Sequence, residues 1–157
     1  MAVRPVPEGY SSITPYLIVS GAAEAIDFYT KAFGAHELMR MPTPNGKVAH
    51  AEMQIGNSRL MLADEQPESG QRSPRSIGGS ATGLMLYVDD VDNVFMRAIG
   101  AGANVQQAVT DQFYGDRSGQ LTDPFGHVWT VATHVEDVPE AELQRRMEKS
   151  MAAVGRE

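Results

Sequence analysis

The sequence contains no cysteine among its 157 residues, which excludes disulfides, thiolate metal ligands and a cysteine nucleophile. Long apolar runs are missing as well. None approaches the about 20 residues that span a bilayer, and residues 1–5 lack the apolar block of a secretion signal. Basic side chains are few, 13 against 20 acidic ones, so the net charge is −7. The missing apolar segments lead us to expect a cytoplasmic protein. Because the net charge matches phosphate backbones and anionic lipid poorly, we expect it to bind neither nucleic acid nor membranes.

Common catalytic signatures are also absent. The sequence has no phosphate-binding loop, dinucleotide fingerprint, Gly-x-Ser-x-Gly elbow or His-Glu-x-x-His pair. The remaining signals of function are therefore the order of the predicted elements and the side chains that they bring together.

An internal repeat organises what is present. In residues 13–65 a predicted strand, a helix that ends at Gly34, a further strand and a hairpin follow one another. The same order returns in residues 81–135, where Asp89-Asp90 is a helix-start signal. Between the two copies, residues 66–80 hold many turn formers and one large apolar residue, which is typical of a linker or flap. We predict an α+β fold in which two βαβββ modules form an open, barrel-like cleft.

Residues 136–157 are predicted to form a helical tail that follows a single domain of residues 1–135. Asp137 and Glu140 have the spacing of a capping box at the start of the helix. Its narrow apolar stripe recurs every four residues: Leu143, Met147 and Met151. Such a stripe needs a surface to lie on, either on the same chain or on a second subunit.

The hairpin of the first module has a register that can be derived from the strand pleat. If Ile55 pairs with Ser58 across the turn, alternate residues point to opposite faces of the sheet. One face is apolar and is expected to pack on a helix: Ala51, Met53, Ile55, Leu60 and Leu62. The other face is polar and contains one methionine, which suits the lining of a cleft better than an open surface: His50, Glu52, Gln54, Arg59, Met61 and Glu65.

Four motifs, three in the first module and one in the second, carry a resemblance that covers about residues 13–135: Thr14-Pro15-Tyr16-Leu17-Ile18-Val19, Ala25-Ile26-Asp27-Phe28-Tyr29, Ala32-Phe33-Gly34-Ala35 and Thr122-Asp123-Pro124-Phe125-Gly126-His127-Val128-Trp129. With the βαβββ repeat, they resemble the vicinal oxygen chelate superfamily, which includes glyoxalases, extradiol dioxygenases and bleomycin-resistance proteins. Three segments are more narrowly similar to its PhnB-type, glyoxalase-like branch: Val48-Ala49-His50-Ala51-Glu52, Tyr114-Gly115-Asp116-Arg117 and Asp123-Pro124-Phe125-Gly126-His127-Val128-Trp129.

The resemblance also implies where a metal ion would lie. Metal-dependent members hold a divalent ion with His, Gln or Glu side chains on the first and last strands of each module. The corresponding positions here are Thr14, Met61, Gly83 and Thr130. None is a good ligand, whereas Lewis-acid chemistry needs about three or four converging His or carboxylate side chains. We therefore predict no cofactor at the family site.

A displaced metal site is the alternative. His50, Glu52 and Glu65 share one predicted face of the first module, and His134 lies on the cleft-facing side of the second. Each also has an ordinary interpretation, for example Glu52 pairing with Arg59 across the hairpin. A divalent metal is expected only if this displaced cluster forms.

An aromatic and polar set on the inward-facing positions predicts a ligand pocket instead: Tyr16, His50, Glu52, Met61, Tyr87, Phe113, Tyr114 and Thr130. Trp129 faces away from Thr130 and is expected in the core, while Phe113 suits the core and the pocket equally. Asp116-Arg117 is able to grip a carboxylate or phosphate, but such a pair is more often a solvated ion pair. His127 is expected to be a cap or a surface group.

These patterns leave three hypotheses open. The leading one is a metal-independent protein that binds a small organic molecule, analogous to the drug-sequestering members of the superfamily. It is expected to be a homodimer, because this fold commonly completes its clefts across subunits. The second is a metal-dependent glyoxalase-like lyase or isomerase, with His50 and Glu52 as catalytic candidates. The third is an interaction module that docks a partner through the C-terminal helix.

Overall fold

The computed structural model describes residues 2–155, and its elements repeat in the predicted order. The first module comprises β1 (Tyr16–Val19), α1 (Ala22–Phe33), β2 (His36–Pro42), β3 (Val48–Ile55) and β4 (Ser58–Asp64). The second comprises β5 (Gly83–Tyr87), α3 (Val91–Gly100), β6 (Asn104–Asp111), β7 (Asp116–Thr122) and β8 (Val128–His134). The 3-10 turn η1 (Pro67–Ser69) and the short helix α2 (Pro74–Ile77) lie between the modules, and α4 (Glu140–Val154) follows the second.

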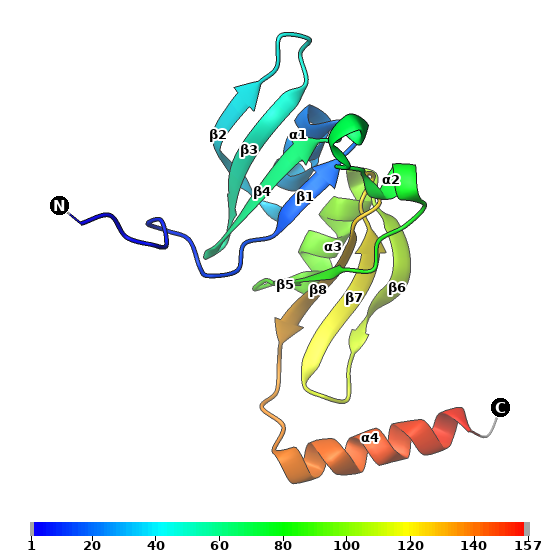
Figure 1. Cartoon of the computed structure of the whole chain (residues 1–157). Helices are drawn as coiled ribbons and strands as arrows, with labels where there is room; N and C mark the ends of the chain where they lie inside the picture. The colour runs from blue at the N-terminus through cyan, green and yellow to red at the C-terminus, as the bar shows by residue number, and fades with distance from the viewer. Residues whose placement is uncertain (1, 156–157) are drawn as a thin grey trace.

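Each module folds into one four-stranded sheet. The strand orders are β1-β4-β3-β2 and β5-β8-β7-β6. The first strand of each module runs parallel to the last, and the other neighbours are antiparallel. Figure 1 shows the two sheets as separate bodies that do not close into a barrel. The predicted α+β class, with two βαβββ modules and a C-terminal helix, is therefore confirmed.

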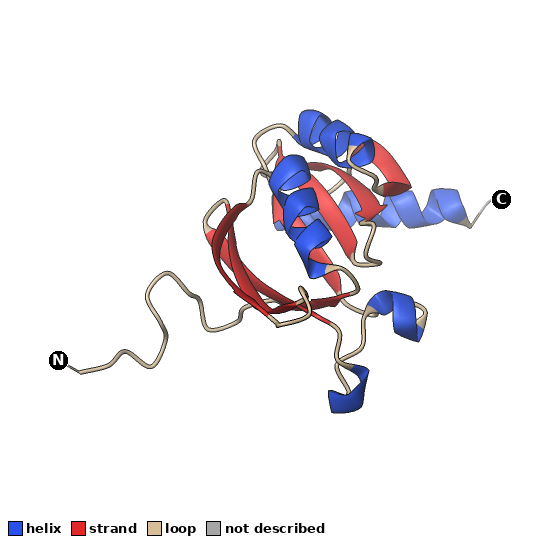
Figure 2. Ribbon diagram, turned by 90° about the horizontal axis from the view of Figure 1, so that it is seen from above, coloured by secondary structure: helices blue, strands red, loops and turns tan. Residues whose placement is uncertain are grey.

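The two helices α1 and α3 contact each other and cover one face of each sheet (Figure 2). Tyr29 and Phe33 of α1 also contact Trp129 of β8, at ring-centroid distances of 5.5 and 4.7 Å. Apolar side chains of both modules thus form one core. The apolar faces of both sheets contribute to this core.

The β3–β4 hairpin has the predicted register, with Ile55 opposite Ser58. Its apolar face is buried throughout: Ala51, Met53, Ile55, Leu60 and Leu62. Its polar face is only partly buried: His50, Glu52, Gln54, Arg59 and Met61. The prediction of a hairpin with one apolar and one polar face is confirmed.

Two segments differ from their predicted form. The first strand begins at Tyr16 and not at residue 13, because Pro15 has no backbone N–H to donate to a neighbouring strand. The segment predicted as a linker packs on the body of the protein through α2. Ser73 and Pro74 are buried, and the Arg75 guanidinium donates to a backbone carbonyl in the β7–β8 turn.

The turn between β7 and β8 is anchored by Asp123, whose side chain is 2% exposed. One carboxylate oxygen accepts hydrogen bonds from the Tyr29 hydroxyl at 2.6 Å and the Trp129 indole N–H at 2.9 Å. The other accepts the backbone N–H groups of Phe125 and His127 at 2.9 and 3.0 Å. The closing motif of the second module is therefore a structural joint between α1 and β8.

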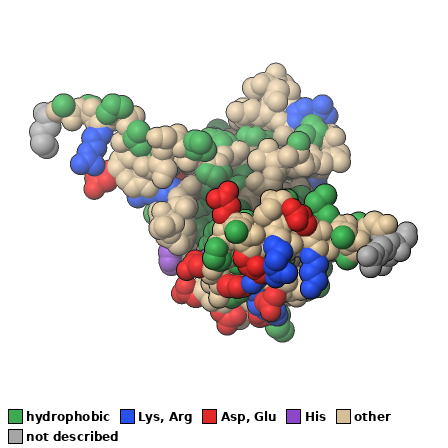
Figure 3. All heavy atoms as spheres, turned by 90° about the horizontal axis from the view of Figure 1, so that it is seen from below, with side chains coloured by type: hydrophobic (Ala, Val, Ile, Leu, Met, Phe, Trp, Pro, Cys, Tyr) green, Lys and Arg blue, Asp and Glu red, His purple; other side chains and the backbone are tan. Residues whose placement is uncertain are grey.

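The helix α4 projects from the second module (Figure 1), and none of its residues is buried. The predicted capping box is wrong. Pro139 is the N-cap, with no side-chain cap, and Asp137 lies against His134 instead. Arg146 ties the helix to the body by donating to the Phe113 carbonyl at 3.1 Å. Figure 3 shows acidic and basic side chains crowded at this end of the molecule.

The apolar stripe of α4 is uncovered toward its end, where Met147 and Met151 are exposed. Docking of this stripe on a partner or on a second subunit therefore stays a prediction. Within residues 2–155, no helix is both long and apolar enough to cross a bilayer.

Candidate functional site

Four side chains meet on the polar face of the first sheet, and we call them the His50 cluster: Tyr10, Tyr16, His50 and Glu52. Strand pairing places Tyr16 of β1 opposite Met61 of β4, and Met61 opposite Glu52 of β3. The Tyr16 hydroxyl lies 2.8 Å from His50 Nδ1, and His50 Nε2 lies 4.0 Å from Glu52 Oε1. The structure therefore brings together four of the predicted ligand-binding residues: Tyr16, His50, Glu52 and Met61.

Tyr10 is the member that reasoning from the sequence missed. Its hydroxyl donates to the Glu52 carboxylate, and the Arg59 guanidinium lies over its ring, 4.8 Å from the centroid. Arg59 does not take Glu52 as its partner. It donates to the Gln54 side chain at 3.1 Å and to the Glu8 carbonyl at 3.2 Å. The only signal in the sequence was a lone aromatic residue in an arm without regular structure.

The tyrosine hydroxyls of the His50 cluster hold their protons. Burial raises the pKa of Tyr10, and the hydrogen bond to Glu52 adds to the effect. Burial and the charge of Glu52 likewise raise the pKa of Tyr16. Both phenols are therefore neutral hydrogen-bonding groups near pH 7, and neither is a nucleophile there.

A second group, the Asp116 cluster, lies on the polar face of the other sheet: Tyr87, Asp116, His134 and Asp137. Asp116 is 4% exposed and accepts a hydrogen bond from the Tyr87 hydroxyl at 2.8 Å. His134 Nδ1 lies 2.8 Å from Asp116, and its Nε2 lies 2.7 Å from Asp137. Thr130 lies on the same sheet, opposite Met85 of β5. Because a carboxylate faces each ring nitrogen, the protonated imidazole donates from both.

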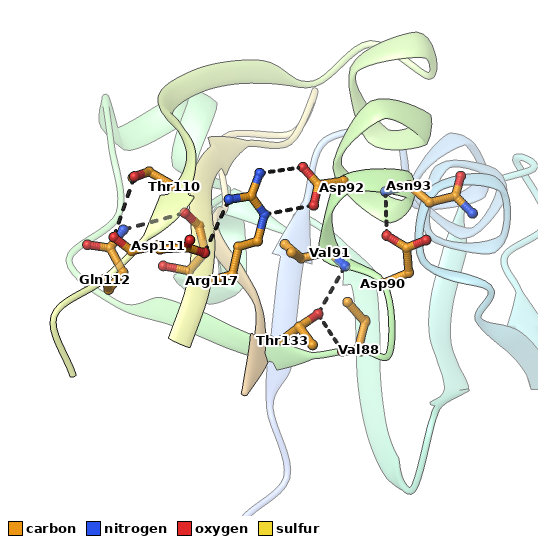
Figure 4. A network of polar contacts seen from close by, with 11 residues as sticks. Val88, Asp90, Val91, Asp92, Asn93, Thr110, Asp111, Gln112, Arg117 and Thr133 are labelled. Atoms are coloured by element: carbon orange, nitrogen blue, oxygen red, sulfur yellow. Dashed lines mark hydrogen bonds and ion pairs between the residues drawn. The ribbon is translucent and has the colours of Figure 1, made fainter. Parts of the chain in front are cut away.

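Arg117 does not form the predicted ion pair with Asp116. Its Nε and Nη2 donate to the Asp92 carboxylate at 2.8 and 2.9 Å, and its Nη1 donates to Asp111 at 3.2 Å (Figure 4). The prediction was wrong because successive residues of a strand point to opposite faces. The side-chain partners of Asp116 are therefore Tyr87 and His134.

The pH dependence of stability tests the Asp116 cluster. The hydrogen bond to Asp116, and then that to Asp137, raise the pKa of His134. A pKa raised by folding adds stability that is fully present below the unfolded value of about 6.5 and is lost as pH rises through the folded value. We expect the difference in Tm between the unsubstituted protein and His134→Gln to be larger at pH 5.5 than at pH 9. An NMR titration midpoint of His134 at or below 6.5 would contradict this.

The residues at the family metal positions do not fit a divalent ion. They offer hydroxyls, a thioether or no side chain: Thr14, Met61, Gly83 and Thr130. The displaced set is not assembled either, because the Glu65 carboxylate accepts from the Ser73 N–H at 2.8 Å and the Ser76 hydroxyl at 2.7 Å. Hydrogen bonds from these serines lower the pKa of Glu65 to about 2. Between residues 2 and 155, no three His, Asp or Glu side chains converge as metal ligands do.

A cleft of about 850 Å³ lies between the modules, bounded by the chain before β1, the β3–β4 turn, β5 and α3. Its walls include Leu17, Leu60 and Leu86, and Tyr87 is the one predicted ligand-binding residue that lines it. The cleft thus opens at the junction of the modules, and its lining also includes charged side chains, among them Asp90 and Arg97. It meets the Asp116 cluster through Tyr87 and includes no member of the His50 cluster.

The remaining candidates lie elsewhere. Phe113 and Tyr114 pack edge to face on each other, with centroids 5.3 Å apart, in the turn between β6 and β7. Trp129 is buried in the core as predicted. His127 is buried too, contrary to its expected place at the surface, and its Nε2 lies 3.0 Å from the Ile18 carbonyl. It connects the β7–β8 turn to the first module.

Comparisons with known proteins agree with this architecture. The family model of the glyoxalase/bleomycin resistance protein/dioxygenase superfamily matches residues 11–131. An uncharacterized protein of Mycobacterium tuberculosis is 46% identical over 139 residues, covering 87% of this chain and 82% of its own. The crystal structure of TioX from Micromonospora sp. ML1 is 29% identical, with a TM-score of 0.62 over 80% of this chain and 99% of its own. A PhnB protein from Bacillus cereus shares the fold at 20% identity and a TM-score of 0.62, covering 78% of this chain and 99% of its own.

Proposed function

Because the chain belongs to the glyoxalase/bleomycin resistance protein/dioxygenase superfamily, we propose that it binds a small organic molecule without a metal ion, in a cleft that two copies complete. One observation carries this proposal. The polar faces of the two sheets are open although they hold aromatic rings and placed hydrogen-bonding groups. Tyr16 and Tyr87, one on each face, are 44% and 58% exposed. Such a combination of rings and a few polar groups is typical of ligand pockets.

A second copy supplies what one chain lacks. The strands β1 and β5 lie at the edges of their sheets, and open edges of this kind are normally covered or paired. Placing β1 of one copy beside β5 of another brings the His50 cluster of the first to face the Asp116 cluster of the second. The proposed homodimer has two such clefts, related by its symmetry axis.

The charges of the two clusters favour a cationic ligand. Glu52, Asp116 and Asp137 contribute three carboxylates against two cations, Arg59 and protonated His134, while Arg146 is paired with Glu136 and Glu142. The net charge of −7 on the whole chain has the same sign and attracts cations. Metal-free bleomycin, a cationic molecule with aromatic rings, is therefore the first probe. The segments around His50 and Asp116 support a finer placement in the PhnB-type branch, and we keep the cytoplasm as the proposed compartment.

Isothermal titration with metal-free bleomycin, before and after dialysis against EDTA, tests the proposal. We expect the same Kd in both states. Tyr16→Ala and Tyr87→Ala should each weaken binding about tenfold, because each removes an aromatic wall worth about 1–2 kcal/mol. Val105→Ala, an exposed position on β6, is the control and should bind normally. Binding that appears only when Ni²⁺, Zn²⁺ or Fe²⁺ is added would overturn the metal-independent function.

Mixing the two tyrosine variants tests whether the cleft is shared. In the proposed dimer, a heterodimer of Tyr16→Ala and Tyr87→Ala has one cleft with both rings and one with neither. After unfolding and refolding a mixture, roughly a quarter of the clefts should regain full affinity. If each copy bound its ligand alone, every cleft would keep one substitution and no tight sites would return.

A further inference from the structure

The arm before β1 crosses the polar face of the first sheet at Tyr10. The Tyr10 backbone N–H donates to the Pro7 carbonyl at 3.1 Å, which closes a four-residue turn. Gly9 has φ of 82° in this turn, as the third residue of a type II turn requires. A side chain at Gly9 would also begin 2.4 Å from the Arg59 guanidinium. The turn therefore presents the Tyr10 ring to the sheet in a defined position.

Two groups of the sheet hold this ring at two different points. The Glu52 carboxylate accepts the hydrogen bond of the phenol hydroxyl. The Arg59 guanidinium lies over the ring face at 4.8 Å, where a cation is attracted to the π electrons. A hydroxyl acceptor and a cation over the face together recognise a phenol, because neither an aliphatic alcohol nor a plain benzene ring satisfies both.

The contacts of the arm with the sheet are few. Besides the Tyr10 contacts, Arg59 reaches the Glu8 carbonyl at 3.2 Å. The side chains on either side are exposed, among them Val3, Val6 and Ile13. Segments with few buried contacts open at low free-energy cost compared with the core. The arm is thus able to leave the sheet while the core stays intact.

We propose that this part of the His50 cluster is a binding site for phenols, and that Tyr10 is its occupant from the same chain, displaced when a phenolic ligand enters. This inference rests on the proposed function and names the ligand class for one wall of the same cleft. A tethered ring competes at an effective concentration in the millimolar range. A phenol from solution must therefore compete with the Tyr10 ring for the site. Removing the Tyr10 ring removes this competition.

Binding of p-cresol, which has the structure of the tyrosine side chain, tests the proposal. We expect Tyr10→Ala to bind p-cresol at least about tenfold more tightly than the unsubstituted protein, measured by NMR titration, because its own ring no longer competes. Toluene has the same ring without the hydroxyl and should bind Tyr10→Ala at least about fivefold more weakly than p-cresol. Val3→Ala, on the same arm, should behave like the unsubstituted protein.

Two further variants test the hydroxyl acceptor and the competition by Tyr10 separately. The double variant Tyr10→Ala, Glu52→Leu should lose the preference for p-cresol over toluene. Gly9→Ala keeps the ring but strains the turn, and should bind p-cresol at an affinity between those of Tyr10→Ala and the unsubstituted protein. If Tyr10→Ala fails to fold, the Gly9→Ala result shows whether the Tyr10 ring competes with p-cresol.

Equal binding of p-cresol and toluene by Tyr10→Ala would overturn the phenol site, and equal binding of p-cresol with and without Tyr10 would overturn its role as occupant. Either result leaves the proposed function standing if metal-free bleomycin still binds through Tyr16 and Tyr87. Loss of bleomycin binding in all forms of the protein, with p-cresol bound as expected, would instead reject the shared cleft and keep the phenol site.

Discussion

We expect the Asp123→Ala variant to lose about 4 kcal/mol or more of its free energy of unfolding. Four donors converge on this carboxylate: the Tyr29 hydroxyl, the Trp129 indole and two backbone N–H groups of its own turn. Each donor left without an acceptor in the core costs about 1–3 kcal/mol. No buried side-chain polar atom between residues 2 and 155 lacks a partner in the native protein, so the substitution creates a defect that the fold does not otherwise contain.

Urea denaturation followed by circular dichroism measures this loss. Asp27→Ala removes an exposed aspartate from α1 and should change stability by less than about 0.5 kcal/mol. Tyr29→Phe removes one of the four bonds and should cost about 1–2 kcal/mol. If Asp123→Ala were no less stable than Asp27→Ala, the joint between α1 and β8 would not be a source of stability.

We expect the second large effect for Asp64→Ala, which should lose about 3 kcal/mol of its free energy of unfolding. The Asp64 carboxylate accepts the backbone N–H groups of Gly21 and Ala22 at 2.9 Å and that of Val48 at 2.8 Å. The helix α1 has Gly21 as its N-cap, with no side-chain cap of its own. A carboxylate from β4 therefore takes the place of the local cap, where the helix dipole also favours negative charge.

The second module offers a matched comparison for this prediction. At the corresponding end of β8, Thr133 Oγ1 accepts the Val91 N–H at 3.0 Å, and α3 has its own cap, because Asp90 accepts the Asn93 N–H at 3.2 Å. The Thr133 hydroxyl also donates to the Val88 carbonyl at 2.8 Å, so Thr133→Val removes two hydrogen bonds and should cost about 1–2 kcal/mol. Thermal unfolding of both variants in the same buffer measures the difference, and equal losses would show that the two helix starts are held in the same way.

The elements themselves were predictable because their signals are local. The helix that stops at Gly34 and the hairpin register at Ile55 and Ser58 match the structure, since periodicity and turn chemistry act over a few residues. The predictions that were wrong concern local signals that lost to another partner, which is near in the sequence for Asp137 and distant for His127. Asp137 had the spacing of a helix cap but lies against His134, and His127 had the position of a surface group but reaches the Ile18 carbonyl.

Residue types and spacing alone determined three features: the paired modules, the alternation of apolar and polar faces, and the lack of metal ligands at the family positions. Only packing in three dimensions determined which polar groups meet. Tyr10 reaches Glu52 across 42 residues of chain, and Tyr29 reaches Asp123 across 94. Packing also joined the two modules, because α1 places the rings of Tyr29 and Phe33 against Trp129 of β8. A short stretch of sequence sets the direction of a side chain relative to its own strand, but the approach of two such strands depends on how the whole core packs.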